Sequence, residues 1–303
     1  MADPKEAYQK VEEELKKHIS GKTEVIELLF IGLVANGHVL LEGVPGVAKT
    51  TMSKALADTM QANFKRIQCM PDLVPEDIVG QAYYDENRDI KLNKGPIFTN
   101  ILLMDELNRA PPRTMSAFLE ALEERQVTLG GQSIPLPKPF MAIATQNPLR
   151  IEGTEALPKV LADRFVMRIE VTYPSMEEEE KMLRIKESEE HIETKKILTI
   201  ADILELQQKA KSIVLPEEAS QYLTKLVDAT RKDIHIVMGA SPRADISFLQ
   251  CAKAKALIEG RSEVTKEDIR FLAKPVLSHR IVVRSTGGIG VNGIIDGILA
   301  SNK

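Results

Sequence analysis

Residues 43–50 read Gly43-Val44-Pro45-Gly46-Val47-Ala48-Lys49-Thr50, the pattern G-x-x-x-x-G-K-[ST] with alanine in place of the second glycine. The apolar run His38–Leu41 precedes this stretch, and a helical pattern, Thr51–Leu56, follows it. In such a strand–loop–helix the backbone N–H groups converge on an anion, and the positive end of the helix adds to the attraction. The stretch therefore predicts a nucleotide site at the start of a helix.

The departure from the pattern is physically mild. Ala48 keeps its N–H, and a helical backbone conformation accommodates its Cβ without strain. In this pattern Lys49 reaches the β- and γ-phosphates, and the Thr50 hydroxyl binds Mg²⁺. A glycine-containing turn that binds nothing is the alternative, and the flanking strand and helix patterns favour the nucleotide site.

The composition is that of an ordinary soluble chain. The 303 residues hold 40 Lys and Arg against 44 Asp and Glu, and a net charge of −4 provides no overall basic field for a nucleic-acid backbone. Cys69 and Cys251 lie far apart and form no disulfide or metal pattern, which is typical of a reducing compartment. The polar N-terminus lacks the apolar core of a signal peptide, so a cytoplasmic location is expected.

Helical and strand patterns alternate from residue 5 to about 170, which predicts a parallel α/β sheet with helices on both faces. Three predicted strands are followed by polar groups: the phosphate-binding loop, Asp105-Glu106 and Gln146-Asn147. Open α/β sheets bind ligands outside the carboxyl ends of their strands, so these groups are expected to meet at one site. The predicted strands are Val39–Glu42, Phe64–Gln68, Ile101–Met104, Phe140–Thr145 and Phe165–Val171.

After about residue 172 the pattern becomes all-helical. Pro216 and Thr265 stand where helix starts are expected. The sequence thus predicts two domains, an α/β core over residues 1–172 and a helical lid with a short C-terminal tail over residues 173–303. The predicted lid helices are Met176–Glu189, Ile200–Ala210, Pro216–Lys232, Ser241–Glu259 and Thr265–Leu277.

Two hairpins are predicted within the core. The first joins Gly80–Tyr84 to Asp89–Leu92 through a polar turn, and the second joins Gln126–Leu129 to Gln132–Leu136 through two glycines. Such hairpins are expected to contact a partner, and plain surface decoration is the alternative. Gly288–Gly293 matches G-x-G-x-x-G but lacks the βαβ unit and the later acidic residue of a dinucleotide site, so a turn into a short helix is predicted.

The run Ile101–Met104 ends in two acids. Asp105 is placed to hold Mg²⁺ together with Thr50, as in P-loop hydrolases. Glu106 is placed to polarise an attacking water. Adjacent residues of a strand point to opposite faces, which suits two different roles. A strand that simply ends in a polar turn is the alternative, which the phosphate-binding pattern disfavours.

Several long motifs together resemble the MoxR family of AAA+ ATPases, and the resemblance runs through nearly the whole chain. They are GVPGVAKT, ILLMDELNRAPPRTMSAFLEALEERQVTLGG, MAIATQNP, LADRF and GASPRA. The family also carries alanine at the position of Ala48. The resemblance implies a ring of subunits, expected to be a hexamer, with an insert in the second helix and a hairpin before the sensor strand. It also implies a chaperone-like remodeller or metal-insertion helper, with von Willebrand factor A domain proteins among its partners.

The resemblance assigns roles to three further residues. Asn147 matches the first sensor, whose amide orients the attacking water. Arg164 matches the arginine finger that enters the neighbouring subunit's site. Arg243 matches the second sensor, and the sequence leaves open whether it acts on the nucleotide of its own subunit or of a neighbour. The segment Gly21–Ile26 resembles the adenine-side edge of the pocket. The predicted nucleotide-binding residues are Gly43, Val44, Pro45, Gly46, Val47, Ala48, Lys49, Thr50, Thr51 and Asp105, with ATP and Mg²⁺ as cofactors.

Three other functions stay open at this stage. A DNA-translocating motor would need basic hairpin tips, and neither Asp85–Arg88 nor Gly130-Gly131 is strongly basic, so nucleic acid is not the expected partner. A non-catalytic nucleotide switch is disfavoured by Glu106. A magnesium-chelatase-like subunit would share the chemistry and differ in its partner.

Overall fold

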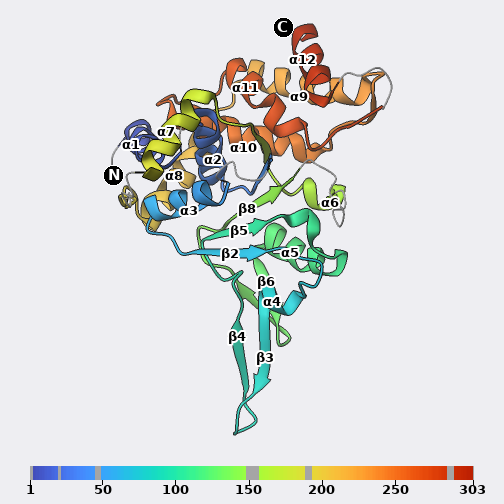
Figure 1. The fold of residues 1–303 in the computed structure, drawn as a ribbon. Coiled ribbons are helices and arrows are strands. Elements are labelled where there is room, and N and C mark those ends of the chain that lie inside the picture. Colours follow the sequence, from blue (N-terminus) through green and yellow to red (C-terminus); the bar gives the residue numbers. More distant parts are fainter. Residues whose placement is uncertain are drawn as a thin grey trace.

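The computed structural model describes residues 3–19, 22–44, 49–147, 157–187, 193–284 and 290–302. Its centre is a five-stranded sheet in the order β2-β5-β8-β1-β9, with every neighbouring pair parallel, so all carboxyl ends lie along one edge (Figure 1). The predicted α/β class and all five predicted strands are confirmed. The strands are β1 Val39–Gly43, β2 Phe64–Gln68, β5 Ile101–Asp105, β8 Met141–Gln146 and β9 Met167–Val171.

Both faces of the sheet are covered, because alternate residues of each strand enter different apolar clusters. Ile101 and Leu103 of β5 pack with the N-terminal helices and the lid, whereas Leu102 and Met104 pack with α5 on the opposite face. A central parallel strand is buried on both faces, and every residue of β5 is buried accordingly. The helices of this part are α1 Pro4–His18, α2 Thr23–Val34, α3 Lys49–Thr59, α4 Pro75–Val79, α5 Pro112–Glu124 and α6 Lys159–Ala162, with a 3-10 turn at Leu107–Arg109.

The C-terminal part is mainly helical, and side-chain caps begin several of its helices. Thr199 and Thr265 each form a capping box with the aspartate three residues on, and Ser241 accepts a hydrogen bond from the N–H of Arg243. Pro216 precedes α9, as the sequence predicts. The helices are α7 Met176–Glu187, α8 Ile200–Ser212, α9 Glu217–Lys232, α10 Pro242–Ile258, α11 Lys266–Leu277 and α12 Val291–Ser301.

The expectation of an all-helical segment after residue 172 is wrong in one detail. β10 Ile236–Met238 pairs antiparallel with β11 Val282–Val283. Strands of two or three residues paired across so long a stretch of chain leave no local periodicity to detect. The predicted terminal helix is present as α12, while residues 288 and 289 of the Gly288–Gly293 segment lie outside the described residues.

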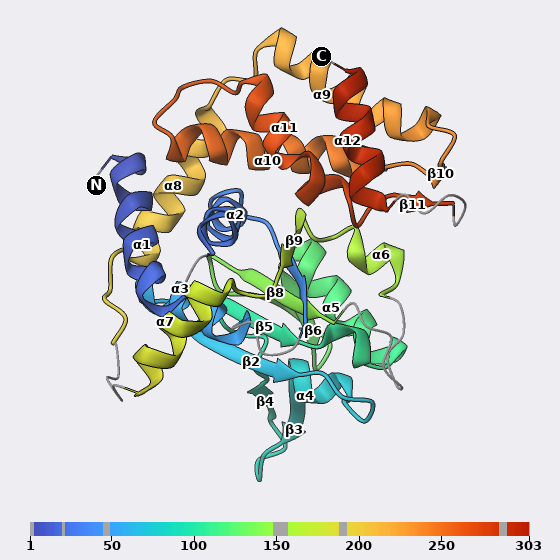
Figure 2. The ribbon, with the colours of Figure 1, turned by 45° about the horizontal axis from the view of Figure 1, so that its top comes forward.

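The C-terminal helices pack on the core through α2. This apolar helix lies between the sheet and the lid and contacts both β9 and α10 (Figure 2). A single buried cluster accordingly runs from α1 and α3 to α12. The division of the chain at residue 172 stays a prediction. In the described part of the chain, no helix is long and apolar enough to cross a membrane.

Two hairpins extend from the core. β3 Gly80–Tyr84 pairs with β4 Ile90–Lys94 and projects away from the body of the molecule (Figure 1). β6 Gln126–Leu129 pairs with β7 Gln132–Pro135 through Gly130 and Gly131, both at positive φ. A Cβ on Gly130 would lie 3.0 Å from the Ala82 Cβ and 3.1 Å from Leu92 Cδ2, so the second turn packs against the first hairpin.

His38, just before β1, is a buried neutral imidazole. Its Nδ1 accepts a hydrogen bond from the Ala142 N–H at 2.9 Å, so Nε2 carries the proton and donates to the Leu122 carbonyl oxygen at 3.0 Å. Burial holds the pKa of His38 well below its ordinary value. Burial likewise lowers the pKa of His279, whose Nε2 lies 3.0 Å from the Phe165 carbonyl oxygen.

We expect the free energy of unfolding to fall when the pH drops below about 6.5. The folded-state pKa values of His38 and His279 lie well below those of the unfolded chain. The unfolded chain therefore binds more protons in this window, and the stability present above pH ~6.5 is lost on acidification. These two groups contribute a slope of at most about 2.7 kcal/mol per pH unit.

Urea titrations at several pH values between about 7.5 and 5 measure this slope, above the range in which carboxylates titrate. In a His38→Gln variant, the difference in bound protons between the unfolded and the folded chain should fall by roughly one, and the slope should fall accordingly. A stability that does not change across this range would contradict the prediction.

Candidate functional site

Three strand ends meet at the carboxyl edge of the sheet. β1 ends at Gly43, β5 ends at Asp105, and Asn147 follows β8 and is 9% exposed. β8 lies between β5 and β1, so these ends are neighbours. The edge therefore brings the start of the phosphate-binding pattern together with the predicted acids and the predicted sensor. Pro45, Gly46, Val47 and Ala48 of that pattern lie outside the described residues.

The first glycine of the pattern has a packing reason of its own. Gly43 pairs with Val171 of β9. A Cβ on Gly43 would lie 2.3 Å from the Val171 carbonyl oxygen, and real Cβ atoms do not approach so closely. A side chain here would therefore push β9 away from β1 at the point where the loop begins.

Lys49 is the first residue of α3 and is half-buried. Its Nζ donates to the carbonyl oxygen of Gly43 and, at 3.3 Å, to that of Val44. Burial lowers the pKa of Lys49, and the carboxylates at the ends of β1 and β5 oppose this shift. The cation thus lies in the field of the acidic strand ends. Thr50 and Thr51 follow in the first turn of α3, half-buried and exposed respectively.

Asp105 is 9% exposed and is held on both oxygens. Its Oδ1 accepts a hydrogen bond from Thr145 Oγ1 at 2.6 Å, and its Oδ2 accepts from Nε and Nη2 of Arg66 at 3.1 and 2.6 Å. The same Thr145 oxygen accepts from the N–H of Glu106 at 2.8 Å. One hydroxyl on β8 therefore fixes both the carboxylate and the turn that follows it.

These oxygens fit a magnesium ion by type. The Asp105 carboxylate and the Thr50 hydroxyl are hard oxygen donors, and both lie where the carboxyl edge meets the start of α3. An ion on Oδ2 would have to displace the Arg66 guanidinium. Among the described residues there is no group of three His, Cys, Asp or Glu that could hold a metal.

Glu106 lies beyond the end of β5 in a left-handed conformation, with φ 56° and ψ 48°. This turn, and not alternation along a strand as expected, separates its side chain from that of Asp105. Its Oε2 accepts from Arg109 Nη1 at 2.7 Å and from Gln68 Nε2 at 3.5 Å. A non-glycine residue in this conformation costs on the order of 1–3 kcal/mol and persists where its surroundings hold it, which is common at functional sites.

A pocket of about 540 Å³ adjoins this edge on the side of β9. One wall is lined by Lys22, Glu24 and Val25, which belong to the segment predicted to lie at the adenine side. Gly21 of that segment lies outside the described residues. The Lys22 ammonium donates to the Thr172 carbonyl oxygen. Other walls come from the end of β9, the start of α7, the end of α11 and the start of α12. Residues of these walls include Arg168, Glu170, Tyr173, Pro174, Lys274, Pro275, Ser278 and Asn292.

Arg164 and Arg243 come together, but far from Lys49. The Arg164 guanidinium forms an ion pair with Glu123 Oε1 at the end of α5, and Arg243 Nη2 reaches the same oxygen at 2.9 Å. These ion pairs hold the pKa of Glu123 below its ordinary value, the hydrogen bond from Arg243 first. The three side chains surround a hollow of about 210 Å³. One carboxylate thus holds an arginine from the core and an arginine from the lid.

The two halves of the predicted site lie at opposite edges of the sheet. The hollow beside the arginine pair is lined by Asn36, Gly37 and His38, which precede β1, whereas Gly43 ends β1 and Lys49 follows it. A five-residue strand spans about 16 Å. Within one chain the structure therefore does not bring Arg164 or Arg243 to the carboxyl edge.

Comparison with known proteins shows the family to which the chain belongs. The ATPase family associated with various cellular activities (AAA) matches residues 38–167, and the AAA lid domain matches residues 228–289. The chaperone MoxR1 of Mycobacterium tuberculosis is 40% identical over 280 residues, which cover 89% of this chain and 74% of that protein. The chain belongs to the MoxR family of AAA+ ATPases.

Two further relatives of this MoxR-family chain match along most of their length. The protein MoxR of Methylorubrum extorquens is 27% identical over 310 residues, covering 93% of this chain and 89% of the relative. The crystal structure of a candidate ATPase from Cytophaga hutchinsonii superposes with a TM-score of 0.91 at 38% identity, covering 98% and 94% of the two chains. The resemblance to the MoxR family and the AAA+ fold with a helical lid are thereby confirmed.

Several residues around the MoxR-family site were not predicted from the sequence. Arg66, Gln68 and Thr145 meet the two acids from neighbouring strands, and Glu123 holds the arginine pair. Their partners are distant along the chain, so no local pattern marks them. The strand order, once known, places Thr145 beside Asp105, because β8 is the neighbour of β5.

Proposed function

We propose that this protein hydrolyses ATP at sites shared between neighbouring copies of itself in a ring. The observation that carries the proposal is the placement of Lys49, Asp105 and Glu106 at one edge of the sheet and of the arginine pair Arg164 and Arg243 at the other. A second copy that docks its arginine edge on the first copy's carboxyl edge completes the site. Such a head-to-tail contact generates a ring when its rotation closes, and the family resemblance favours a closed ring of six.

We place ATP across the carboxyl edge, with its adenosine in the pocket of about 540 Å³ and its phosphates on the loop before α3. Lys49 would leave the carbonyl oxygens of its own loop and neutralise the β- and γ-phosphates. Thr50 and Asp105 would hold Mg²⁺, which supplies charge neutralisation on the phosphate oxygens when bound. Thr51, which is exposed in the first turn of α3, would lie beside the phosphates together with Thr50 and Asp105.

Hydrolysis would follow from the positions of the remaining groups. Glu106 would accept a proton from the water whose oxygen attacks the γ-phosphorus, as the bond to the ADP oxygen breaks. Asn147, buried at the end of β8, would orient that water. Arg164 and Arg243 of the neighbour would neutralise the charge that spreads over the γ-phosphate oxygens. On this placement both arginines act on the neighbour's nucleotide.

We infer that the work done with ATP is remodelling or activation of a partner protein. A relative 40% identical is a chaperone by name, and the β3–β4 hairpin projects with Tyr83 and Tyr84 exposed. The tip of that hairpin, residues 85–89, holds three acids and one arginine, which does not favour a nucleic-acid backbone. The family resemblance alone suggests a von Willebrand factor A domain protein as the partner. The sequence alone suggests a cytoplasmic location.

Phosphate release from ATP and Mg²⁺ tests the proposal directly. We expect Lys49→Ala to weaken ATP binding roughly 10- to 150-fold, since a hydrogen bond to a charged group contributes about 1.5–3 kcal/mol. Lys54→Ala is the matched control on the same helix, because Lys54 is exposed and pairs with Asp58 at 2.6 Å. Equal ATP affinity of the two variants, or no phosphate release by the unaltered chain, would argue against the proposed site.

A further inference from the structure

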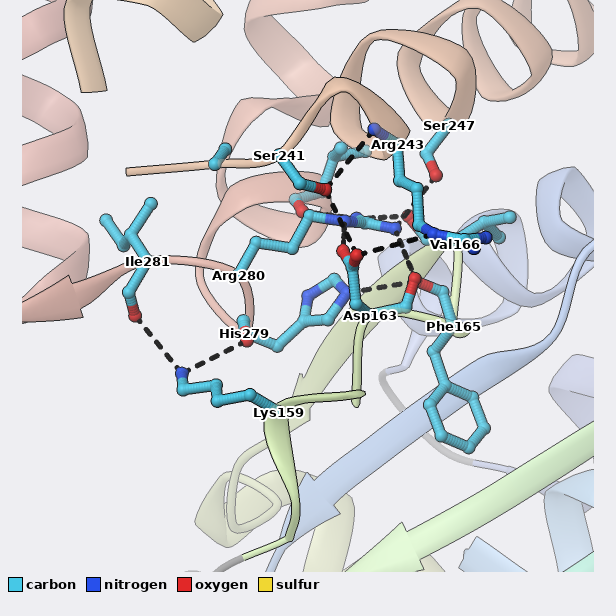
Figure 3. A network of polar contacts seen from close by, with 12 residues as sticks. Lys159, Asp163, Phe165, Val166, Ser241, Arg243, Ser247, His279, Arg280 and Ile281 are labelled. Carbon is cyan, nitrogen blue, oxygen red and sulfur yellow. Dashed lines mark hydrogen bonds and ion pairs between the residues drawn. The ribbon is translucent and has the colours of Figure 1, made fainter. Parts of the chain in front are cut away.

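Asp163 joins the core to the lid beside Arg243 (Figure 3). It directly precedes Arg164 in the chain. Its Oδ2 accepts a hydrogen bond from Ser241 Oγ at 3.0 Å and lies 3.7 Å from Arg243 Nε. Ser241 is the residue that caps α10, the helix whose first turn carries Arg243. The carboxylate therefore belongs to the segment that carries Arg164, and it contacts the start of the helix that carries Arg243.

Arg280 holds this carboxylate in place. Its side chain is 1% exposed, and its Nε donates to Asp163 Oδ1 at 2.9 Å. The rest of the guanidinium donates to the carbonyl oxygens of Phe165 and Val166 at 2.7 and 3.1 Å and to Ser247 Oγ at 2.8 Å. Figure 3 shows these bonds converging from the segment before β9 and from the lid helices. The buried cation is thus matched by its carboxylate, by two carbonyl oxygens of the core and by a hydroxyl of the lid.

The two carboxylates near the arginine pair differ in their surroundings. Glu123 is 42% exposed, so its ion pairs with Arg164 and Arg243 are open to exchange with another anion. Asp163 is 24% exposed and is bonded to a buried guanidinium. Exchange of Glu123 for a phosphate group would leave the contacts of Asp163 in place. The segments of the two arginines would then stay joined through Asp163, while the ion-pair partner of the arginines changes from Glu123 to the phosphate.

We propose that Asp163, locked by Arg280, is a positioning residue that sets the arginine pair Arg164 and Arg243 for the nucleotide of the neighbouring subunit. This inference rests on the proposed function, in which both arginines act between copies. Holding an arginine in one geometry costs conformational entropy of both backbone and side chain, and fixing its backbone segment beforehand removes the backbone's share of that cost. Asp163 fixes the two segments to each other, although one belongs to the core and the other to the lid.

Asp163→Asn keeps the shape of the side chain and removes the charge that faces Arg280 and Arg243. A displacement of about 1 Å in a catalytic group lowers a rate by up to about 10²-fold, and we expect a loss of kcat of that order. The Kd for ATP should stay within about twofold, because the variant's own nucleotide pocket lies at the opposite edge of the sheet. Phosphate release and fluorescent-nucleotide titration measure the two quantities.

Mixing of subunits separates positioning from general damage. Asp163→Asn subunits retain an intact phosphate loop, and Lys49→Ala subunits retain intact arginines. Rings that contain both should recover phosphate release, as should rings mixed from Arg164→Ala and Lys49→Ala. Recovery in the Arg164→Ala mixture without recovery in the Asp163→Asn mixture would overturn the inference and leave the proposed function standing. No recovery in either mixture, with mixed assembly confirmed, would overturn both.

Asp268→Asn is a matched control for loss of a buried lid carboxylate. Asp268 is 2% exposed and pairs with Arg261 at 2.6 Å, at the other end of α11 from Arg280. This control should lower the melting temperature and leave kcat unchanged. If Asp163→Asn does not fold, Ser241→Ala removes one bond to Asp163 and keeps the buried ion pair. Its kcat should fall a few-fold with recovery in the mixture, and an unchanged kcat would overturn the inference.

Discussion

Replacement of Glu106 by glutamine is expected to lower the rate of ATP hydrolysis by about 10²- to 10⁴-fold, the usual contribution of a general base, while ATP binding is retained. Glutamine keeps an oxygen that accepts from Arg109 and Gln68, so the local hydrogen bonds survive. It cannot take the proton of the attacking water. The residue also lies in a left-handed turn held by Thr145, which glutamine can occupy as glutamate does.

The measurement is single-turnover phosphate release beside a nucleotide titration on the same preparation. Glu124→Gln is the matched control, because Glu124 ends α5 and accepts a hydrogen bond from Gln126 at 3.0 Å, away from the carboxyl edge. It should hydrolyse ATP at the unaltered rate. Normal turnover by Glu106→Gln would remove Glu106 from the proposed mechanism. The same variant, held with ATP, is also the form in which a protein partner should remain bound for capture.

The edge of the sheet was predictable from the sequence because its signals are local. Alternating strand and helix patterns placed all five strands within two residues of their observed ends. The parallel arrangement then carried Gly43, Asp105 and Asn147 to one edge without further information. The MoxR-family resemblance depended on such local motifs too.

The partners of these residues were not predictable in the same way. Arg66 contacts Asp105 across 39 positions of sequence, and Arg280 contacts Asp163 across 117. Such contacts depend on strand order and on how the lid packs on the core, which no spacing rule encodes. Adjacent acids were expected to diverge by strand alternation, whereas the turn at Glu106 separates them. The sequence leaves open whether Arg243 serves its own or a neighbouring site, and its contact with Glu123 beside Arg164 supports the proposal that it serves a neighbour's.

Replacement of Arg164 by alanine is expected to lower kcat by about 10³- to 10⁵-fold, the contribution of an arginine finger to phosphoryl transfer. The variant's own Kd for ATP should not change, because Arg164 precedes β9 at the amino edge while the phosphate loop follows β1 at the carboxyl edge. Glu123 keeps its contact with Arg243 at 2.9 Å, so the carboxylate is not left without a cation. Arg270→Ala, an exposed arginine of the lid, is the control and should hydrolyse ATP normally.

Mixed rings decide whether the finger acts between subunits. An Arg164→Ala subunit brings a working phosphate loop, and a Lys49→Ala subunit brings working arginines. Random assembly of equal amounts places a working loop against a working finger at about one quarter of the interfaces, so part of the activity should return. If each arginine served its own subunit, neither parent would contribute a complete site and the mixture would stay inactive. Activity that rises and falls with the mixing ratio therefore requires a site built from both edges of the sheet, each from a different molecule.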